Sequence, residues 1–169
     1  ACPQPLTPLT GDALAMENGA RVVFVSSNQN INSNLVKLQA EVGKLQQALQ
    51  AIGGSATVNS AYRPLAYQQH FWEIIDRWIT SGLKDNTNPA CASIKTQVGA
   101  EYSKHGLETV VSRPSGCATH VKGTGIDISL SGYSHSAINA FMQSKNIDLS
   151  WQSITNDPYH FNLKNPPYT

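Results

Sequence analysis

The spacing of hydrophobic residues predicts a mixture of helices and strands along the 169-residue chain. Apolar residues recur every three or four positions in residues 32–52 and 65–79, which is the period of an amphipathic helix. Weaker helical patterns cover residues 94–105 and 136–144. Alternating or β-branched runs predict strands at residues 21–27, 56–63, 108–112, 125–130, 149–153 and 159–163. The predicted fold class is therefore α+β.

The start of the chain differs from the rest. The opening ACPQPLTPLTG contains three prolines and no hydrophobic period, so we expect residues 1–20 to form an extended arm or linker. Residues 21–169 are expected to form a single domain, because a hydrophobic content of 40% is enough for one core.

The charge and hydropathy patterns exclude two classes of partner. The formal net charge is +1 and only 14% of the residues are charged, so no basic surface for nucleic acid is expected. No run approaches the roughly 18 consecutive apolar residues that a membrane-spanning helix needs. We expect a monomer.

The three cysteines, Cys2, Cys91 and Cys117, do not form a C-x-x-C pair, which argues against a thiolate zinc site. A disulfide between Cys91 and Cys117 is favoured, because Cys2 lies in the arm that we expect to be mobile. A disulfide is useful mainly outside the reducing cytosol. We therefore expect an extracytoplasmic protein, secreted or periplasmic, and the proline-rich start favours a module of a larger secreted protein.

The segment T-H-V-K-G-T-G-I-D places His120 on a glycine-rich turn and Asp127 in the strand that follows. Imidazole nitrogen and carboxylate oxygen together suit zinc, and a catalytic zinc site uses three protein ligands. Gly123 and Gly125 let the backbone turn tightly and approach other groups closely. Taken alone, the segment is explained equally well by a surface histidine and an ordinary capping aspartate.

The segment D-P-Y-H-F supplies a third candidate ligand, His160, at the end of a predicted strand. Asp157 precedes it in a turn fixed by Pro158, from which a carboxylate can act as a general base on a metal-bound water. Without the other segment, a common Asp-Pro turn and a half-buried histidine explain the same residues.

The segment N-S-A-Y-R-P-L-A-Y-Q-Q places Arg63 at a strand end and Gln68 on the next helix. A guanidinium in that position suits an oxyanion or a substrate carbonyl. The alternative is that Arg63 forms a surface ion pair and that Gln68 is a solvated helix residue.

The order S-x-Y-R and Q, then T-H-x-x-G-x-G-x-D, then D-P-Y-H-F resembles the zinc D,D-peptidases. These include D-alanyl-D-alanine carboxypeptidases, vancomycin-resistance D,D-peptidases and phage endolysins, in one superfamily with lysostaphin and the hedgehog signalling domain. The resemblance covers about residues 60–163. It implies a small antiparallel sheet flanked by helices and a bound zinc ion.

The resemblance also implies roles for individual residues. Zinc ligands are His120, Asp127 and His160, and Asp157 is the catalytic carboxylate. Arg63 contacts substrate and oxyanion, and Ser60 and Gln68 lie at positions that support or contact substrate. Two departures from the family pattern stand out: Asp157 replaces the common Glu, and Gly125 replaces the common Ala.

The function expected from these residues is a zinc metallopeptidase that hydrolyses the peptide stems of bacterial peptidoglycan. Either a carboxypeptidase or an endopeptidase fits. The alternative is a binding module that keeps the zinc fold without hydrolysis, although such a module needs neither a base nor an oxyanion partner. The remaining histidines, His70, His105 and His135, are interpreted as structural or surface groups.

Overall fold

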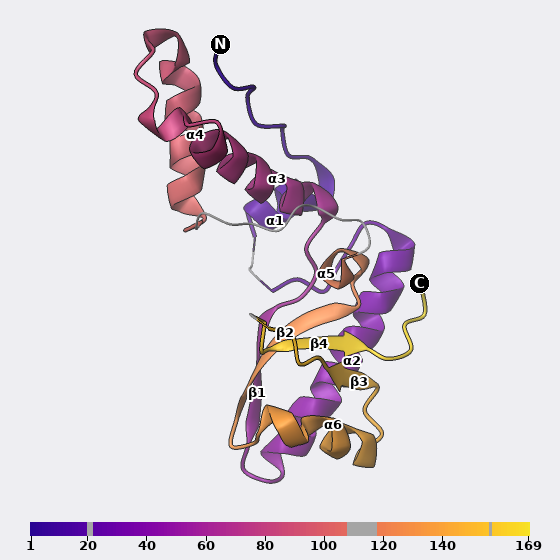
Figure 1. Cartoon of the computed structure of the whole chain (residues 1–169). Helices are drawn as coiled ribbons and strands as arrows, with labels where there is room; N and C mark the ends of the chain where they lie inside the picture. The colour runs from indigo at the N-terminus through magenta and orange to yellow at the C-terminus, as the bar shows by residue number, and fades with distance from the viewer. Residues whose placement is uncertain (20–21, 108–117, 156) are drawn as a thin grey trace. The chain divides into compact units, whose positions relative to one another are not determined.

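The computed structural model describes residues 1–19, 22–107, 118–155 and 157–169. The chain divides into two compact units, which are coloured by residue number in Figure 1. Unit 1 comprises residues 1–17 and 65–115, and unit 2 comprises residues 18–64 and 116–169. The segment 65–115 forms a unit with the start of the chain, and the single domain expected over residues 21–169 stays a prediction.

Unit 2 contains a four-stranded antiparallel sheet in the order β1-β2-β4-β3. The strands are β1 (Ser55–Ser60), β2 (Gly125–Ser131), β3 (Leu149–Trp151) and β4 (His160–Leu163). The helices are α2 (Gln29–Gln50), α5 (Thr119–Lys122) and α6 (His135–Ser144). A small antiparallel sheet combined with helices confirms the predicted α+β class.

The core of unit 2 lies between α2, α6 and one face of the sheet (Figure 1). Helix α2 begins where the Asn28 side chain accepts hydrogen bonds from the first backbone N–H groups, which otherwise have no partner. Its leucines meet Ile126, Ile128 and Phe161, all fully buried. Side chains alternate between the two faces of a strand. Asp127, between Ile126 and Ile128, and His160, next to Phe161, therefore face the other side of the sheet.

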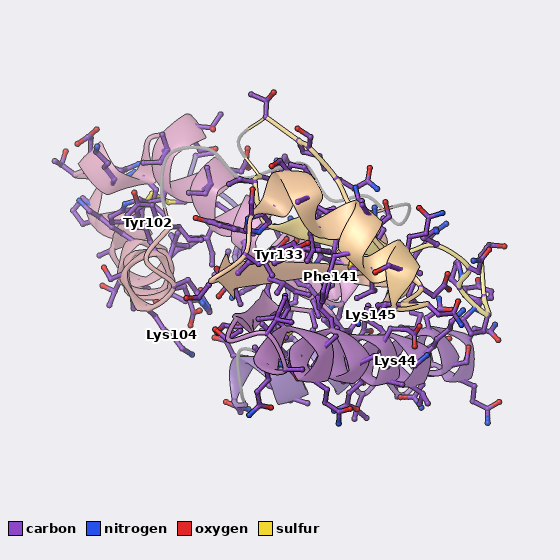
Figure 2. The ribbon with its side chains drawn as sticks, turned by 90° about the horizontal axis from the view of Figure 1, so that it is seen from below. Lys44, Tyr102, Lys104, Tyr133, Phe141 and Lys145 are labelled. Carbon is purple, nitrogen blue, oxygen red and sulfur yellow. A yellow bond between two sulfur atoms is a disulfide. The ribbon has the colours of Figure 1, made fainter. Side chains whose placement is uncertain are left out.

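Helix α6 completes this core with Ile138 and Met142, which are fully buried. Beside them the rings of Tyr133 and Phe141, both labelled in Figure 2, have their centroids 4.9 Å apart. Lys145 extends over the Phe141 ring. The apolar face of α6 thus packs within unit 2.

Unit 1 consists of short helices with a small core. Its elements are α1 (Gly11–Glu17), α3 (Leu65–Ile75), the π-helix η1 (Asp76–Thr80), the 3₁₀ helices η2 (Leu83–Asp85) and η3 (Pro89–Cys91), and α4 (Ala92–Lys104). The buried core residues are Leu6, Ile74, Leu83, Cys91 and Val98. Because Leu6 and α1 belong to this unit, the expectation of an extended arm over residues 1–20 differs from the structure.

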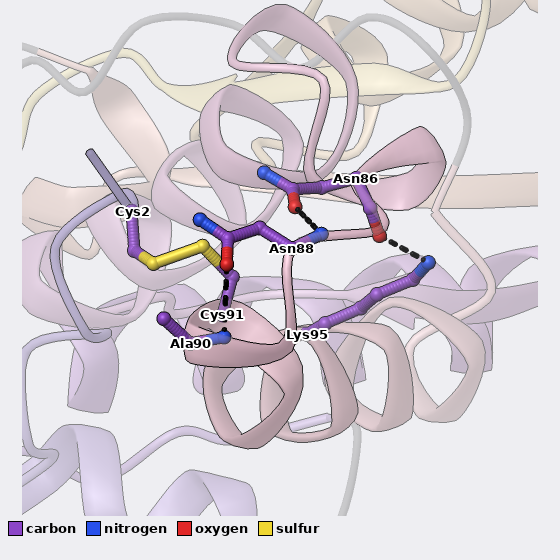
Figure 3. Close-up of a disulfide and its surroundings, with 6 residues drawn as sticks. All are labelled: Cys2, Asn86, Asn88, Ala90, Cys91 and Lys95. Atoms are coloured by element: carbon purple, nitrogen blue, oxygen red, sulfur yellow. Dashed lines mark hydrogen bonds between the residues drawn. A yellow bond between two sulfur atoms is a disulfide. The ribbon is translucent and has the colours of Figure 1, made fainter.

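The disulfide prediction was wrong in its pairing. Cys91 bonds to Cys2, with Cα atoms 5.5 Å apart (Figure 3), and Cys117 lies outside the described residues. Cys91 sits in η3, whose first turn is capped by the Asn88 side chain. Cys2 does not lie in a free end, because Leu6 packs into the core of unit 1 and holds the start of the chain there.

Several elements match their predictions and a few do not. The helices predicted at residues 32–52, 65–79, 94–105 and 136–144 are present with shifted ends. Residues 22–27 form no strand; the hydrogen bond from the Tyr62 amide to the Val23 carbonyl links them to the rest of unit 2. His120 lies on the short helix α5 rather than on a turn. The strand predicted at residues 108–112 falls outside the described residues. Among those described, no helix is both long and apolar enough to span a bilayer.

Candidate metal centre

Three polar residues form a row across the sheet of unit 2. Ser60 in β1 pairs directly with Asp127 in β2, and Asp127 pairs with His160 in β4. Directly opposed residues present their side chains on the same face of a sheet. An irregularity in β1 between Val58 and Ser60 shifts the register and brings Ser60 opposite Asp127. The sheet therefore collects a hydroxyl, a carboxylate and an imidazole on the face away from the core.

His120 reaches the same place from α5. The helix ends at Gly123, whose φ of +75° is a conformation that residues with a Cβ rarely adopt. A Cβ at Gly123 would also lie 3.0 Å from Leu35 of α2. The backbone amide of Arg63 donates a hydrogen bond to the His120 carbonyl, at 3.1 Å. The turn after β1 thus fixes the helix that carries this histidine.

The three predicted ligands converge. One donor atom from each of His120, Asp127 and His160 lies within 4.8 Å of the others. Oδ1 of Asp127 is 3.5 Å from Nε2 of His120 and 3.3 Å from Nδ1 of His160. Ligand bonds of about 2.0–2.1 Å in a tetrahedral zinc site place neighbouring donor atoms roughly 3.3 Å apart. The separations therefore fit three corners of a zinc tetrahedron.

The second polar atom of each candidate ligand is held by a hydrogen bond. Nδ1 of His120 lies 2.7 Å from the carbonyl oxygen of Ala61, to which it donates as Nδ1–H. Nε2 of His160 lies 2.9 Å from Oδ1 of Asn162, and Oδ2 of Asp127 accepts from the Ser60 hydroxyl at 2.7 Å. Hydrogen bonds of this kind orient metal ligands and select the histidine tautomer. Each residue is left with one donor atom directed at the common point.

Electrostatics make this point attractive to a cation. Burial alone would raise the pKa of Asp127, but hydrogen bonds from His120, His160 and Ser60 outweigh burial and hold the pKa well below its usual range. Burial likewise opposes the charged form of His160, but hydrogen bonds to Asp127 and Asn162 and the charges of Asp127 and Asp157 raise its pKa. In the metal-free protein, a proton on His160 thus balances part of the negative charge of Asp127, as a bound cation would.

Gly125, where the family commonly has Ala, is required by close packing at this site. A Cβ built on Gly125 would lie 2.3 Å from Oγ1 of Thr119 and 3.0 Å from Cε1 of His160. Oγ1 of Thr119 is itself 3.2 Å from Nε2 of His160. The departure at position 125 therefore accompanies a threonine packed directly against a candidate ligand.

Asp157 lies beside His160, one of the three candidate ligands. Its backbone pairs with Ile154, and its Oδ2 is 3.7 Å from Nδ1 of His160. The Asp157 side chain is 41% exposed, so water can reach it. The shorter aspartate side chain, a departure from the common Glu, thus still reaches the edge of the cluster.

The three residues predicted to contact or support substrate are Ser60, Arg63 and Gln68. The half-buried Ser60 donates a hydrogen bond to Asp127, and Arg63 lies three residues after the end of β1. Gln68 lies on α3 in unit 1, whereas the candidate ligands belong to unit 2. Substrate contacts by these residues stay predictions.

Sequence reasoning missed one partner of His160, Asn162, and one whole cluster. Asn162 could have been found, because it lies two residues after His160 and shares its face of β4. Unit 1 contains a second group that could hold a metal, formed by Glu17, His70, Glu101 and His105. The sequence alone suggests only structural or surface roles for His70 and His105.

A three-ligand site with one carboxylate, two imidazoles and an acid beside it is the arrangement of catalytic zinc hydrolases. The fold and the site therefore define a metal-dependent hydrolase. The VanY family model, described as D-alanyl-D-alanine carboxypeptidase, matches residues 32–168. The chain belongs to this family, and the resemblance found from the motifs is confirmed.

Two solved structures are among those similar to the chain. One is a mutant of the vancomycin-resistance D,D-pentapeptidase VanY from a VanB-type cassette, in complex with Zn(II), at 19% identity and a TM-score of 0.43, covering 77% of this chain and 72% of that one. The other is VanYB in complex with D-alanine-D-alanine, at 20% identity and a TM-score of 0.42, covering 77% and 71%. The comparison with curated proteins gave no match.

Proposed function

We propose that the protein is a zinc-dependent peptidase that hydrolyses peptide bonds in the stems of bacterial peptidoglycan, with the metal held by His120, Asp127 and His160. The observation that carries the proposal is the convergence of these three donor atoms, each with its other polar atom hydrogen-bonded. The donor set suits zinc, and the side chains of His120 and Asp127 keep about a fifth to a quarter of their surface exposed. A further position is thereby accessible to water or substrate.

The chemistry follows from the groups around the site. A zinc ion held by His120, Asp127 and His160 would lower the pKa of a bound water to about 7 and would polarise a carbonyl. Asp157 accepts the proton of the attacking water and later returns it to the leaving amine, a role supported by the 3.7 Å between its Oδ2 and the ligand atom of His160. Arg63 is proposed to stabilise the oxyanion, since its backbone amide is hydrogen-bonded to the carbonyl of His120, one of the proposed ligands.

The substrate class is proposed to be a stem peptide ending in D-Ala-D-Ala. Membership of the D-alanyl-D-alanine carboxypeptidase family supports it, and one similar structure is described in complex with D-alanine-D-alanine. A carboxypeptidase is therefore preferred to an endopeptidase. A non-hydrolytic binding module is the less favoured alternative, because the carboxylate of Asp157 beside the ligands has no purpose in a purely structural site.

An extracytoplasmic location, secreted or periplasmic, is part of the same proposal. The disulfide between Cys2 and Cys91 supports it, because such bonds persist mainly in oxidising compartments. Peptidoglycan is assembled in that space. The location is tested by fractionating producing cells and probing each fraction for the protein with oxidised cysteines.

The activity is tested by mass spectrometry of purified stem pentapeptide and of cross-linked cell-wall fragments after incubation with the protein. Loss of one terminal alanine from the pentapeptide, abolished by a chelator and restored by zinc, is the expected result. Cleavage of the cross-links alone would replace the carboxypeptidase by an endopeptidase. No cleavage of either substrate by zinc-loaded protein would leave the binding module as the better explanation.

A further inference from the structure

Unit 1 contains a cluster of two histidines and two glutamates that the peptidase chemistry does not use. Glu17 is the last residue of α1, and His70 lies in the middle of α3. Glu101 and His105 lie one turn apart at the end of α4. Three segments that are distant in the sequence therefore bring metal-binding side chains together within one unit.

The distances in this cluster are those of donor atoms that share a centre. Oε2 of Glu101 is 3.2 Å from Nε2 of His70 and 3.1 Å from Nε2 of His105. Nε2 of His105 is also 3.2 Å from Oε2 of Glu17, and all four residues offer a donor atom within 4.8 Å of the others. Bonds of about 2.0–2.1 Å to a tetrahedral zinc predict donor separations of roughly 3.3 Å.

Hydrogen bonding within the protein does not satisfy this cluster. Nε2 of His105 carries at most one hydrogen but faces two carboxylate oxygens, and a single N–H is directed at one acceptor. Oε2 of Glu17 is buried without a hydrogen-bond partner. Buried polar atoms without partners are costly and call for a missing ligand, ion or water.

The surroundings favour a charged carboxylate and oriented rings. Burial alone would raise the pKa of Glu17, but hydrogen bonds from Lys104 and Tyr67 and the charge of His105 outweigh burial and lower the pKa to about 2. Lys104, labelled in Figure 2, binds the other oxygen of Glu17 at 2.6 Å. Oε2 is thus left to face the cluster.

Aromatic rings surround the two imidazoles. The ring of Phe71 lies 4.8 Å from that of His105, and Tyr67 is stacked on His70 with centroids 6.0 Å apart. Such packing restricts the rotation of the imidazoles and preorganises ligands before a metal binds.

We propose that Glu17, His70, Glu101 and His105 form a second metal site, which binds Zn²⁺ and has a structural role. Four protein ligands close the coordination shell of zinc, which is the property of structural rather than catalytic sites. Two imidazoles with two carboxylates suit zinc better than calcium or magnesium, which prefer oxygen ligands alone.

The proposed ion compensates for the small core of unit 1. That core contains five buried apolar residues, and units of this size commonly rely on a disulfide or a metal for stability. The disulfide joins the start of the chain to η3, while the metal joins the ends of α1 and α4 to α3. The two cross-links act on different segments of the same unit.

The experiment counts zinc by elemental analysis of the full chain after dialysis against micromolar free zinc. Wild-type protein is expected to hold two zinc ions per chain and the His120→Ala variant one. The double variant Glu101→Gln with His105→Gln is also expected to hold one, and it should keep peptidase activity. His135→Gln is the matched control and is expected to hold two, because His135 belongs to neither cluster.

Two results would overturn the proposal. One is a single zinc ion in fully loaded wild-type protein, which does not depend on any variant folding. The other is a folded double variant that still binds two. As a second readout, zinc added to metal-free His120→Ala protein should raise its unfolding temperature by several degrees, and an unchanged temperature would count against the site.

Discussion

Replacing Ser60 by Ala separates a role in holding a metal ligand from a role in binding substrate. The change removes the 2.7 Å hydrogen bond from the Ser60 hydroxyl to Oδ2 of Asp127. Oδ1 of the same carboxylate is the atom that faces both candidate histidine ligands. Without the hydroxyl, the carboxylate is freer to rotate away from the metal.

The magnitude follows from the kind of hydrogen bond. Bonds to charged groups contribute about 1.5–3 kcal/mol net. The Asp127 side chain is 26% exposed, so water can replace part of the lost bond and the lower end applies. A loss of about 1.5 kcal/mol corresponds to roughly tenfold weaker zinc binding, which lies within the 10–100-fold range found for partners of metal ligands.

The assay is competition for zinc between the protein and a chromogenic chelator at neutral pH. Ser129→Ala is the matched control, because its hydroxyl also bonds within this sheet, to Asn59 at 2.7 Å, but contacts no candidate ligand. The control should bind zinc as wild type does. Unchanged zinc affinity in Ser60→Ala, together with a raised KM, would refute this reasoning and return Ser60 to a substrate-contacting role.

Three further predictions concern the same molecule. Gly125→Ala places a Cβ 2.3 Å from Oγ1 of Thr119, so it should destabilise the protein by about 1–3 kcal/mol in thermal unfolding. Adding Thr119→Gly in the same chain should restore much of this stability. An unchanged stability of Gly125→Ala would contradict the close packing at this position. The pKa of His160 is raised in the metal-free protein, so its proton competes with zinc. The measured zinc affinity should therefore fall as the pH drops through that pKa, by up to about tenfold per pH unit. A zinc affinity that does not change with pH would contradict His160 as a ligand. Cys2→Ser should lower the free energy of unfolding by about 2–5 kcal/mol, measured by denaturant titration with and without reductant. Equal stability of the oxidised wild type and the variant would show that the bond to Cys91 does not form.

Much of unit 2 could be predicted from local patterns. The period of apolar residues defined α2, and the alternation in GIDISL defined β2 and thereby the face of Asp127. His160 is adjacent to Phe161, a core residue, so the alternation of β4 also indicated that the histidine faces away from the core. These features depend on a few neighbouring residues, which sequence patterns report well.

Features that depend on distant parts of the chain could not be predicted in this way. The pairing of Cys91 with Cys2 required knowing that the proline-rich start packs onto unit 1. The cluster of Glu17 with His70 joins helices far apart in sequence, and only the spacing of Glu101 and His105 was readable as one helix face. The segment 22–27 has strand-forming residues but finds no ladder of backbone partners among the described residues.

The most direct test of the central claim measures zinc content and turnover together in the Asp157→Ala variant. Asp157 is proposed as the base but not as a ligand, and its Oδ2 lies 3.7 Å from the ligand atom of His160. The variant should bind zinc at the His120, Asp127 and His160 site with wild-type stoichiometry while losing release of D-alanine from a stem pentapeptide. Wild-type turnover in a zinc-loaded Asp157→Ala protein would contradict the proposed mechanism.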